Sequence, residues 1–138
     1  MPNGSGDVAA GAPNIQSYTA HGDGTVTDNV TGLTWQQSTP KSTYAWSDAI
    51  AYCSTVTLGN LGDWRLPSVI ELVSIVDYDV ASPTPSIDIT AFPKTPADIF
   101  WSSTLVAGAP SEAWYVNFSY GYAISTDVSE INHVRCVR

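Results

Sequence analysis

The stretch Trp46-Ser47-Asp48-Ala49-Ile50-Ala51-Tyr52-Cys53 reads as a helix that carries the first of the chain's two cysteines. Its apolar residues recur with the spacing i, i+3, i+4 and i+7, which predicts an amphipathic helix with one buried stripe. The stripe consists of Trp46, Ala49, Ile50 and Cys53. The helix therefore has a cysteine at the end of its predicted apolar face.

The second cysteine lies at the other end of the chain, in His133-Val134-Arg135-Cys136-Val137-Arg138, which reads as a final strand. A bond between the cysteines would tie an early helix to the last strand and close most of the domain into one loop. By its effect on the entropy of the unfolded chain, such a bond is worth roughly 4–5 kcal/mol. The layout also implies an oxidising compartment.

Composition bounds the class of protein. A chain of 138 residues with 43% hydrophobic residues and five tryptophans is expected to fold as one globular domain. Thirteen acidic residues against five basic ones give a net charge of −8. That balance argues against binding to nucleic acid, which needs clustered Lys and Arg, and against docking on anionic membranes. No apolar run approaches the ~20 residues of a membrane span, so no membrane insertion is expected.

The chain divides into a flexible N-terminal arm or linker, residues 1–17, and one domain, residues 18–138. The domain opens with a predicted hairpin over residues 22–35. A second helix is predicted after Ser68, because Ser68-Val69-Ile70-Glu71 is a capping box; its buried stripe is Val69, Leu72, Val73 and Val76. A long segment, residues 77–98, then precedes predicted strands near 99–103, 113–119, 122–126 and 132–137, with a tight turn at Tyr120-Gly121.

This order of elements predicts an α+β fold with two helices, a mostly antiparallel sheet and long loops. It is also the order of the C-type-lectin-like fold. Six short motifs resemble, in order, those of one bacterial family, the C-terminal domain of the Legionella collagen-like (Lcl) adhesin. They are Asp23-Gly24-Thr25-Val26-Thr27-Asp28, Thr31-Gly32-Leu33-Thr34-Trp35, Asp63-Trp64-Arg65-Leu66-Pro67, Trp101-Ser102-Ser103-Thr104, Ala113-Trp114-Tyr115-Val116-Asn117-Phe118 and Val134-Arg135-Cys136-Val137-Arg138.

The resemblance implies a C-type-lectin-like fold and a secreted or cell-surface location. For the namesake adhesin it also implies a homotrimer and binding of sulfated glycosaminoglycans. A Cys53–Cys136 disulfide suits this fold, because it joins the helix to the end of the chain. The partner would be an extracellular glycan or a host surface protein.

Most residues in these motifs have a structural interpretation that outweighs a functional one. Arg65 is expected to pair with Asp63, Glu71 or a carbonyl group, and Arg135 is expected to be fixed within the sheet. In Trp101-Ser102-Ser103-Thr104 the tryptophan is expected to pack in the core while the hydroxyls bond the backbone. The aromatic residues Trp114, Tyr115 and Phe118 are also assigned to the core, although an exposed one could stack on a sugar ring.

Neither a metal cofactor nor an enzyme is expected. The sequence lacks the EF-hand spacing and the Glu-Pro-Asn or Gln-Pro-Asp motifs of calcium-dependent sugar-binding lectins. Aspartates in loop-like sequence leave a structural calcium open: Asp23, Asp28, Asp77, Asp79, Asp88 and Asp98. The histidines, His21 and His133, are too isolated for a zinc site. Catalysis has little support, since both cysteines are better explained as a disulfide, and an enzyme is the weakest of three hypotheses.

Two functions remain. The first is a bacterial surface adhesin or ligand-binding domain, which for a sulfated glycan needs local positive charge. The candidate ligand-binding residues are Lys41 and Lys94, both in loops, and the terminal Arg138. The alternative is a structural or oligomerisation cap of a secreted fibrous protein, which binds a protein partner or no ligand itself.

Overall fold

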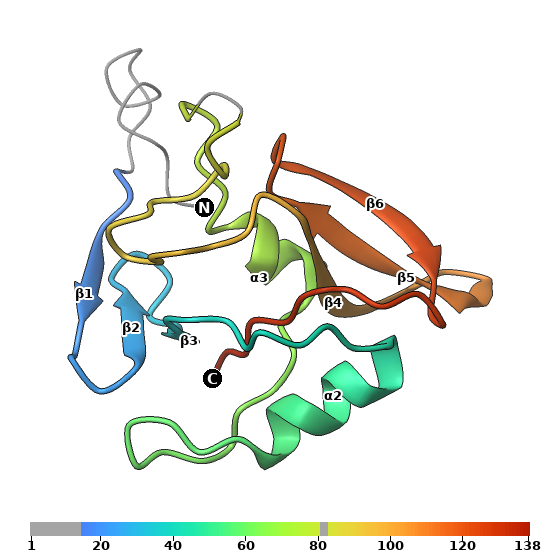
Figure 1. The fold of residues 1–138 in the computed structure, drawn as a ribbon, viewed down its shortest axis with the longest axis horizontal. Coiled ribbons are helices and arrows are strands. Elements are labelled where there is room, and N and C mark those ends of the chain that lie inside the picture. Colours follow the sequence, from blue (N-terminus) through green and yellow to red (C-terminus); the bar gives the residue numbers. More distant parts are fainter. Residues whose placement is uncertain (1–14, 81–82) are drawn as a thin grey trace.

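The computed structural model describes residues 15–80 and 83–138. These residues form two helices and two separate three-stranded antiparallel sheets, as Figure 1 shows. The predicted α+β class is confirmed, but the expected single sheet is wrong, because the hairpin forms a sheet of its own. Of the predicted N-terminal arm, residues 1–14 lie outside the described residues.

The first sheet is built from β1 (Tyr18–Ala20), β2 (Thr25–Asp28) and β3 (Thr34–Gln36) in that order. The β2–β3 pair is the predicted hairpin, with Val26 opposite Trp35. Its turn is held by the Asp28 carboxylate, which accepts hydrogen bonds from the backbone N–H groups of Val30 and Thr31. The three-residue strand β1 was not predicted, and it extends the hairpin by pairing with β2.

Helix α2 (Trp46–Thr55) confirms the predicted first helix. Ala49 and Cys53 are buried, but Ile50 is 36% exposed, so its assignment to the buried stripe is wrong. The half-buried ring next to the cysteine is Tyr52, which stacks on Tyr44 with ring centroids 5.2 Å apart. The buried face is therefore rotated toward the C-terminal segment that carries the second cysteine.

Helix α3 (Val69–Val73) begins at the predicted capping box. The Ser68 hydroxyl accepts from the Glu71 N–H, and the Glu71 carboxylate accepts from the Ser68 N–H. The helix is only five residues long, so Val76, predicted to belong to its stripe, is buried in the loop beyond the helix. Arg65 donates two hydrogen bonds, of 2.6 and 2.7 Å, to the same Glu71 carboxylate, which settles the predicted pairing of Arg65 in favour of Glu71.

The second sheet contains β4 (Ile99–Val106), β5 (Ala109–Asn117) and β6 (Tyr122–Asp127), with β5 in the centre. The predicted strands at 99–103, 113–119 and 122–126 are thus confirmed with shifted ends. A turn at Tyr120 and Gly121 joins β5 to β6, as predicted, with the Gly121 N–H bonded to the Asn117 carbonyl at 2.7 Å.

The predicted strand over residues 132–137 is wrong. This C-terminal segment makes single bridges with several partners instead of a continuous ladder. Val137 bridges Trp35 on one side and Arg65 on the other, while His133 bridges Phe100 of β4. The segment therefore runs between parts of the chain that otherwise do not pair, and it lies at the centre of the domain.

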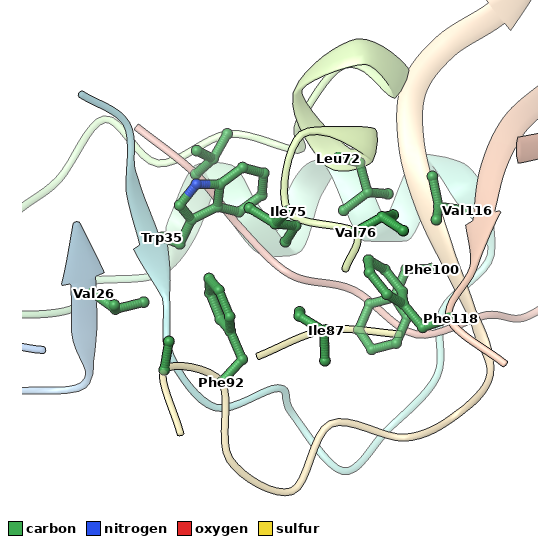
Figure 2. Packing of buried hydrophobic residues seen from close by; sticks show 12 residues of the cluster. Val26, Trp35, Leu72, Ile75, Val76, Ile87, Phe92, Phe100, Val116 and Phe118 are labelled. Atoms are coloured by element: carbon green, nitrogen blue, oxygen red, sulfur yellow. The ribbon is translucent and has the colours of Figure 1, made fainter. Parts of the chain in front are cut away.

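The core consists of two clusters of buried side chains. Figure 2 shows the larger one, in which residues of the hairpin, α3 and the second sheet surround Phe92 and Ile87. Both of these residues come from the long segment 77–98, which is therefore packed against the core along part of its length. The second cluster contains Trp64, Trp101 and the disulfide between Cys53 and Cys136.

Candidate functional site

A cleft of about 300 Å³ is lined by both Lys41 and Lys94, the two lysines predicted as ligand contacts. One wall comes from the segment after β3 and the other from the end of the long segment before β4. The lining residues are Ser38, Thr39, Pro40, Lys41, Pro93, Lys94, Pro96 and His133. The volume is at the lower end of the range for small-molecule sites and suits one or two sugar rings.

The wall that carries Lys41 is tied to the segment of the opposite wall by the side chain of Gln37, which precedes Lys41 in the sequence. Gln37 Nε2 donates a 3.1 Å hydrogen bond to the Ala91 carbonyl. The Gln37 N–H in turn donates to the Gly24 carbonyl at 3.0 Å, which fixes this segment to the hairpin sheet. Lys41 is exposed, so its ammonium group is presented to solvent at the cleft.

The wall that carries Lys94 is anchored on both sides of the lysine. Phe92 is fully buried in the larger core cluster. Thr95 is buried as well, and its hydroxyl donates a 2.7 Å bond to the Phe92 carbonyl. Lys94 itself has a φ of +58°, a left-handed backbone conformation that its two anchored neighbours must hold in place. The exposed lysine therefore projects from a rigid turn.

The buried guanidinium of Arg135 donates hydrogen bonds to the segments that form both walls of the cleft. Its Nη1 donates to the carbonyl oxygens of Gln36 and Gln37, at 2.7 and 2.6 Å. Its Nη2 donates to the Thr95 hydroxyl at 2.8 Å. The guanidinium also lies over the Phe92 ring, 4.7 Å from the centroid. The prediction that Arg135 is structurally fixed agrees with this arrangement: one bond goes to the last residue of β3, Gln36, and the others go to Gln37 and Thr95 outside the strands.

Arg135 is 1% exposed, and this burial lowers its pKa to about 9. The side chain is therefore still charged at neutral pH. Its acceptors are neutral carbonyl and hydroxyl oxygens, so no carboxylate hydrogen bond among the described residues neutralises it. The charge therefore adds to the positive potential of the segments that form the cleft.

His133 was not proposed as a ligand contact, yet it lines the cleft. Its backbone is held against β4 by bonds to Ile99 and Trp101. Nε2 lies 3.3 Å from Asp98 Oδ2, while Nδ1 is buried without a hydrogen-bond partner in the described structure. Nothing in the sequence near His133 indicated this position, because the lysine-bearing loops are distant from it along the chain.

The cleft has the chemistry of an anion site. Two lysines and two hydroxyl side chains can donate hydrogen bonds, and the three proline rings offer apolar surface. Within the described residues, no Asp or Glu is part of the lining, although the protein carries a net charge of −8. A sulfate or carboxylate group on a sugar would meet ammonium donors here, and the ring could rest on proline.

The third candidate, Arg138, is not part of the cleft lining. Its side chain is at an exposed position, and its backbone exchanges 2.9 Å hydrogen bonds with Thr34 in both directions. The structure thus groups Lys41 with Lys94 and leaves Arg138 outside this group.

The loop aspartates act mainly as turn caps. The Asp88 carboxylate accepts bonds from the Thr90 and Ala91 N–H groups, and Asp23 accepts from Thr25 in the same manner. Asp23 also accepts a 2.6 Å hydrogen bond from the Thr25 hydroxyl, and this bond holds the pKa of the Asp23 carboxyl below its usual value. Within the residues that the structure describes, no three His, Cys, Asp or Glu side chains gather in a way that could hold a metal ion.

The aromatic motifs lie largely as predicted. Trp101 is fully buried, and its indole N–H donates to the Tyr44 carbonyl at 2.8 Å. The Ser102 hydroxyl donates to the Trp114 carbonyl, and the Thr104 hydroxyl accepts from the Val69 N–H. Of the three aromatic residues that were assigned to the core in the motif at residues 113–118, Phe118 is buried, whereas Trp114 and Tyr115 are only half-buried.

No helix in the described part of the chain has the length and apolar character needed to span a bilayer.

Comparison with known proteins supports the sequence resemblance. A search among curated proteins found no match. Residues 24–138, which include the hairpin β2–β3, both helices, the second sheet and the disulfide, match the family described as the Lcl C-terminal domain. The chain therefore belongs to the Lcl C-terminal domain family.

Proposed function

We propose that this domain is a ligand-binding module of a secreted or surface-attached bacterial adhesin, and that it binds sulfated glycosaminoglycans through the cleft between Lys41 and Lys94. The observation that carries the proposal is the shared cleft itself. The chain has only two lysines, and they line the same cavity although they are 53 positions apart in the sequence. Family membership supports the same class of function.

The arrangement favours a ligand with closely spaced anionic groups. Each ammonium group stands on a loop tied to the core, so little conformational freedom of the backbone is lost on binding. The net charge of −8 repels a polyanion at long range, but at physiological salt this repulsion is screened beyond ~8 Å. Local attraction in the cleft can therefore exceed the repulsion by the rest of the surface.

The proposal is tested by the affinity of the protein for immobilised heparin, with the double variant Lys41→Gln/Lys94→Gln. Glutamine removes the charge, keeps an unbranched polar side chain that is one atom shorter, and makes a comparable demand on the left-handed backbone at residue 94. We expect retention of the wild type to fall steeply as salt is raised, and the double variant to elute near the void volume even at low salt.

The matched control changes the net charge by the same amount elsewhere. Ser47→Glu with Ala107→Glu adds two negative charges at exposed positions of α2 and the β4–β5 turn, outside the cleft. This control should keep most of the wild-type retention. Equal weakening in both double variants would mean that only net charge matters and would contradict the cleft assignment. Arg138→Glu, measured alongside, decides whether the C-terminus contributes.

The C-type-lectin-like fold and assembly as a homotrimer are further parts of the proposal, and the family resemblance supports both. The oligomerisation cap is the competing function. It predicts a stable trimer without affinity for heparin, so light scattering on the sample used for the heparin measurement separates the two functions.

A further inference from the structure

Three tyrosines gather on the surface around the turn between β5 and β6. Tyr78, Tyr120 and Tyr122 are 59%, 65% and 46% exposed. The rings of Tyr120 and Tyr122 are nearly parallel, with an interplanar angle of 9° and centroids 6.0 Å apart. Exposed aromatic side chains in one group are uncommon on a protein surface and are typical of binding sites.

Gly121 is what allows the third tyrosine to join the other two. A Cβ atom at this position would lie 3.1 Å from Cε1 of Tyr78 and 2.8 Å from Cγ1 of Val76. The glycine also has a φ of +80°, which other residues rarely adopt. Without a side chain, the turn packs directly against the loop that follows α3, and the two segments lie side by side in Figure 1.

A neighbouring polar contact fixes the orientation of one ring. Asn117 Nδ2 donates a 3.2 Å hydrogen bond to the Tyr122 hydroxyl. The Asn117 carbonyl accepts the turn bonds from Tyr120 and Gly121, so the same residue organises both the turn and the ring. The turn and the Tyr122 ring are therefore held in place before any ligand binds.

The sequence on either side of these rings disfavours an anionic ligand. No Lys or Arg occurs in residues 66–93 or 95–134, the stretches that contain all three tyrosines, and Tyr78 stands between Asp77 and Asp79. A nucleic acid or a sulfated glycan would find aromatic faces, but these stretches supply no Lys or Arg for its phosphates or sulfates. A ligand that fits combines apolar surface for the rings with hydrogen-bond donors for the tyrosine hydroxyl oxygens.

We propose that Tyr78, Tyr120 and Tyr122 form a second binding site, which takes uncharged, hydroxyl-rich saccharides. The C–H face of a pyranose ring can cover an aromatic ring, while the sugar hydroxyl groups bond the tyrosine hydroxyls. The near-parallel, open arrangement of Tyr120 and Tyr122 suits a flat ring better than an organic cation, which is best enclosed by rings from several sides. This site uses none of the residues that line the lysine cleft.

The test is an NMR titration of protein with labelled tyrosine rings against four uncharged hexasaccharides, those of β-glucose, α-glucose, mannose and N-acetylglucosamine. We expect at least one of them to shift the signals of Tyr120 and Tyr122. Tyr120→Ala should weaken that binding about tenfold, since stacking is lost. Tyr122→Phe keeps the ring and should change the affinity less than about threefold.

Two controls distinguish this site from the lysine cleft. Binding should be the same at about 50 mM and about 500 mM NaCl, because no ionic contact is involved. It should also be unchanged in Lys41→Gln/Lys94→Gln. Absence of binding for all four sugars at about 10 mM would overturn the proposal. So would full affinity in Tyr120→Ala, or loss of affinity in the lysine variant.

Discussion

Arg135 donates a 2.8 Å hydrogen bond to the hydroxyl of Thr95, the residue directly after Lys94. The same guanidinium binds the carbonyl oxygens of Gln36 and Gln37 in the segment that leads to Lys41. One buried side chain next to the disulfide therefore sets the relative position of the two loops that carry the candidate ligand contacts. The stability of the domain and the geometry of the cleft depend on the same residue.

The first prediction concerns this residue. Arg135→Lys keeps a buried charge but cannot span the three acceptors, so we expect a loss of about 3–5 kcal/mol in the free energy of unfolding. Arg135→Met also loses the bonds but removes the charge, and it should cost less, about 1–3 kcal/mol. Urea unfolding followed by tryptophan fluorescence measures both values. A lysine variant as stable as the wild type would contradict the bridging role.

The second prediction concerns the disulfide. Cys53 and Cys136 are both fully buried, so a mild reductant without denaturant should leave the bond intact. After reduction in denaturant, or in Cys53→Ala/Cys136→Ala, the free energy of unfolding should fall by roughly 4–5 kcal/mol. Thiol titration before and after unfolding checks this expectation. Two reactive thiols in the native, non-reduced protein would refute it.

The third prediction concerns the pH dependence of the Arg65–Glu71 pair. Hydrogen bonds from Arg65 lower the pKa of the Glu71 carboxyl from its ordinary value of 4.5. The folded state therefore gains stability from this group above that value and loses it as the pH falls through the lower folded-state pKa. Since Arg65 is half exposed, Glu71→Gln should cost only about 0.5–1 kcal/mol at neutral pH.

Glutamine preserves the capping-box geometry, so the cost of Glu71→Gln should disappear in acid, where the wild-type carboxyl is protonated as well. Ser68→Ala serves as the control, because the bond of its hydroxyl to the Glu71 N–H does not titrate. It should cost about 1 kcal/mol at both neutral and acidic pH. A pH-independent cost of Glu71→Gln would show that the ion pair contributes nothing to stability.

The fourth prediction concerns the turn beneath the tyrosines. Gly121→Ala combines an unfavourable positive φ with a Cβ atom 2.8 Å from Val76, so it should destabilise the fold by about 2 kcal/mol or more. Gly108→Ala is the matched control, since this glycine has a similar φ of +76° but open space around it. A thermal unfolding scan should show the larger decrease in melting temperature for Gly121→Ala. Equal decreases would mean that the contact with Val76 and Tyr78 is unimportant.

The parts of the fold that were predicted depend on local signals. The capping box at Ser68 and the turn residues between β2 and β3 act within a few positions of the sequence, and each appears where the pattern places it. The wrong predictions concern the tertiary environment of individual side chains. Ile50 has the right spacing for the buried face of α2, but the face is rotated toward Cys136, and this follows from packing rather than from helical period.

The candidate site was predictable in part for the same reason. Lys41 and Lys94 were selected because loop lysines are free to bind, but their meeting in one cleft depends on the bonds of Gln37 and Arg135 to distant loops. No spacing in the sequence reports such contacts. The contact of Tyr78 with the Tyr120–Gly121 turn is equally long-range, and the sequence indicated only the tight turn itself.

The central claim, that Lys41 and Lys94 together hold a sulfated glycan, is tested most directly by their own NMR signals. Because the chain has only two lysines, protein labelled with ¹³C-lysine gives one Cε signal for each. A heparin-derived tetrasaccharide is titrated into this sample at physiological salt. We predict that both signals shift along the same saturation curve and return when salt is raised to ~1 M, where charges are screened within about 3 Å. Unmoved signals, or a shift of one lysine without the other, would contradict the claim.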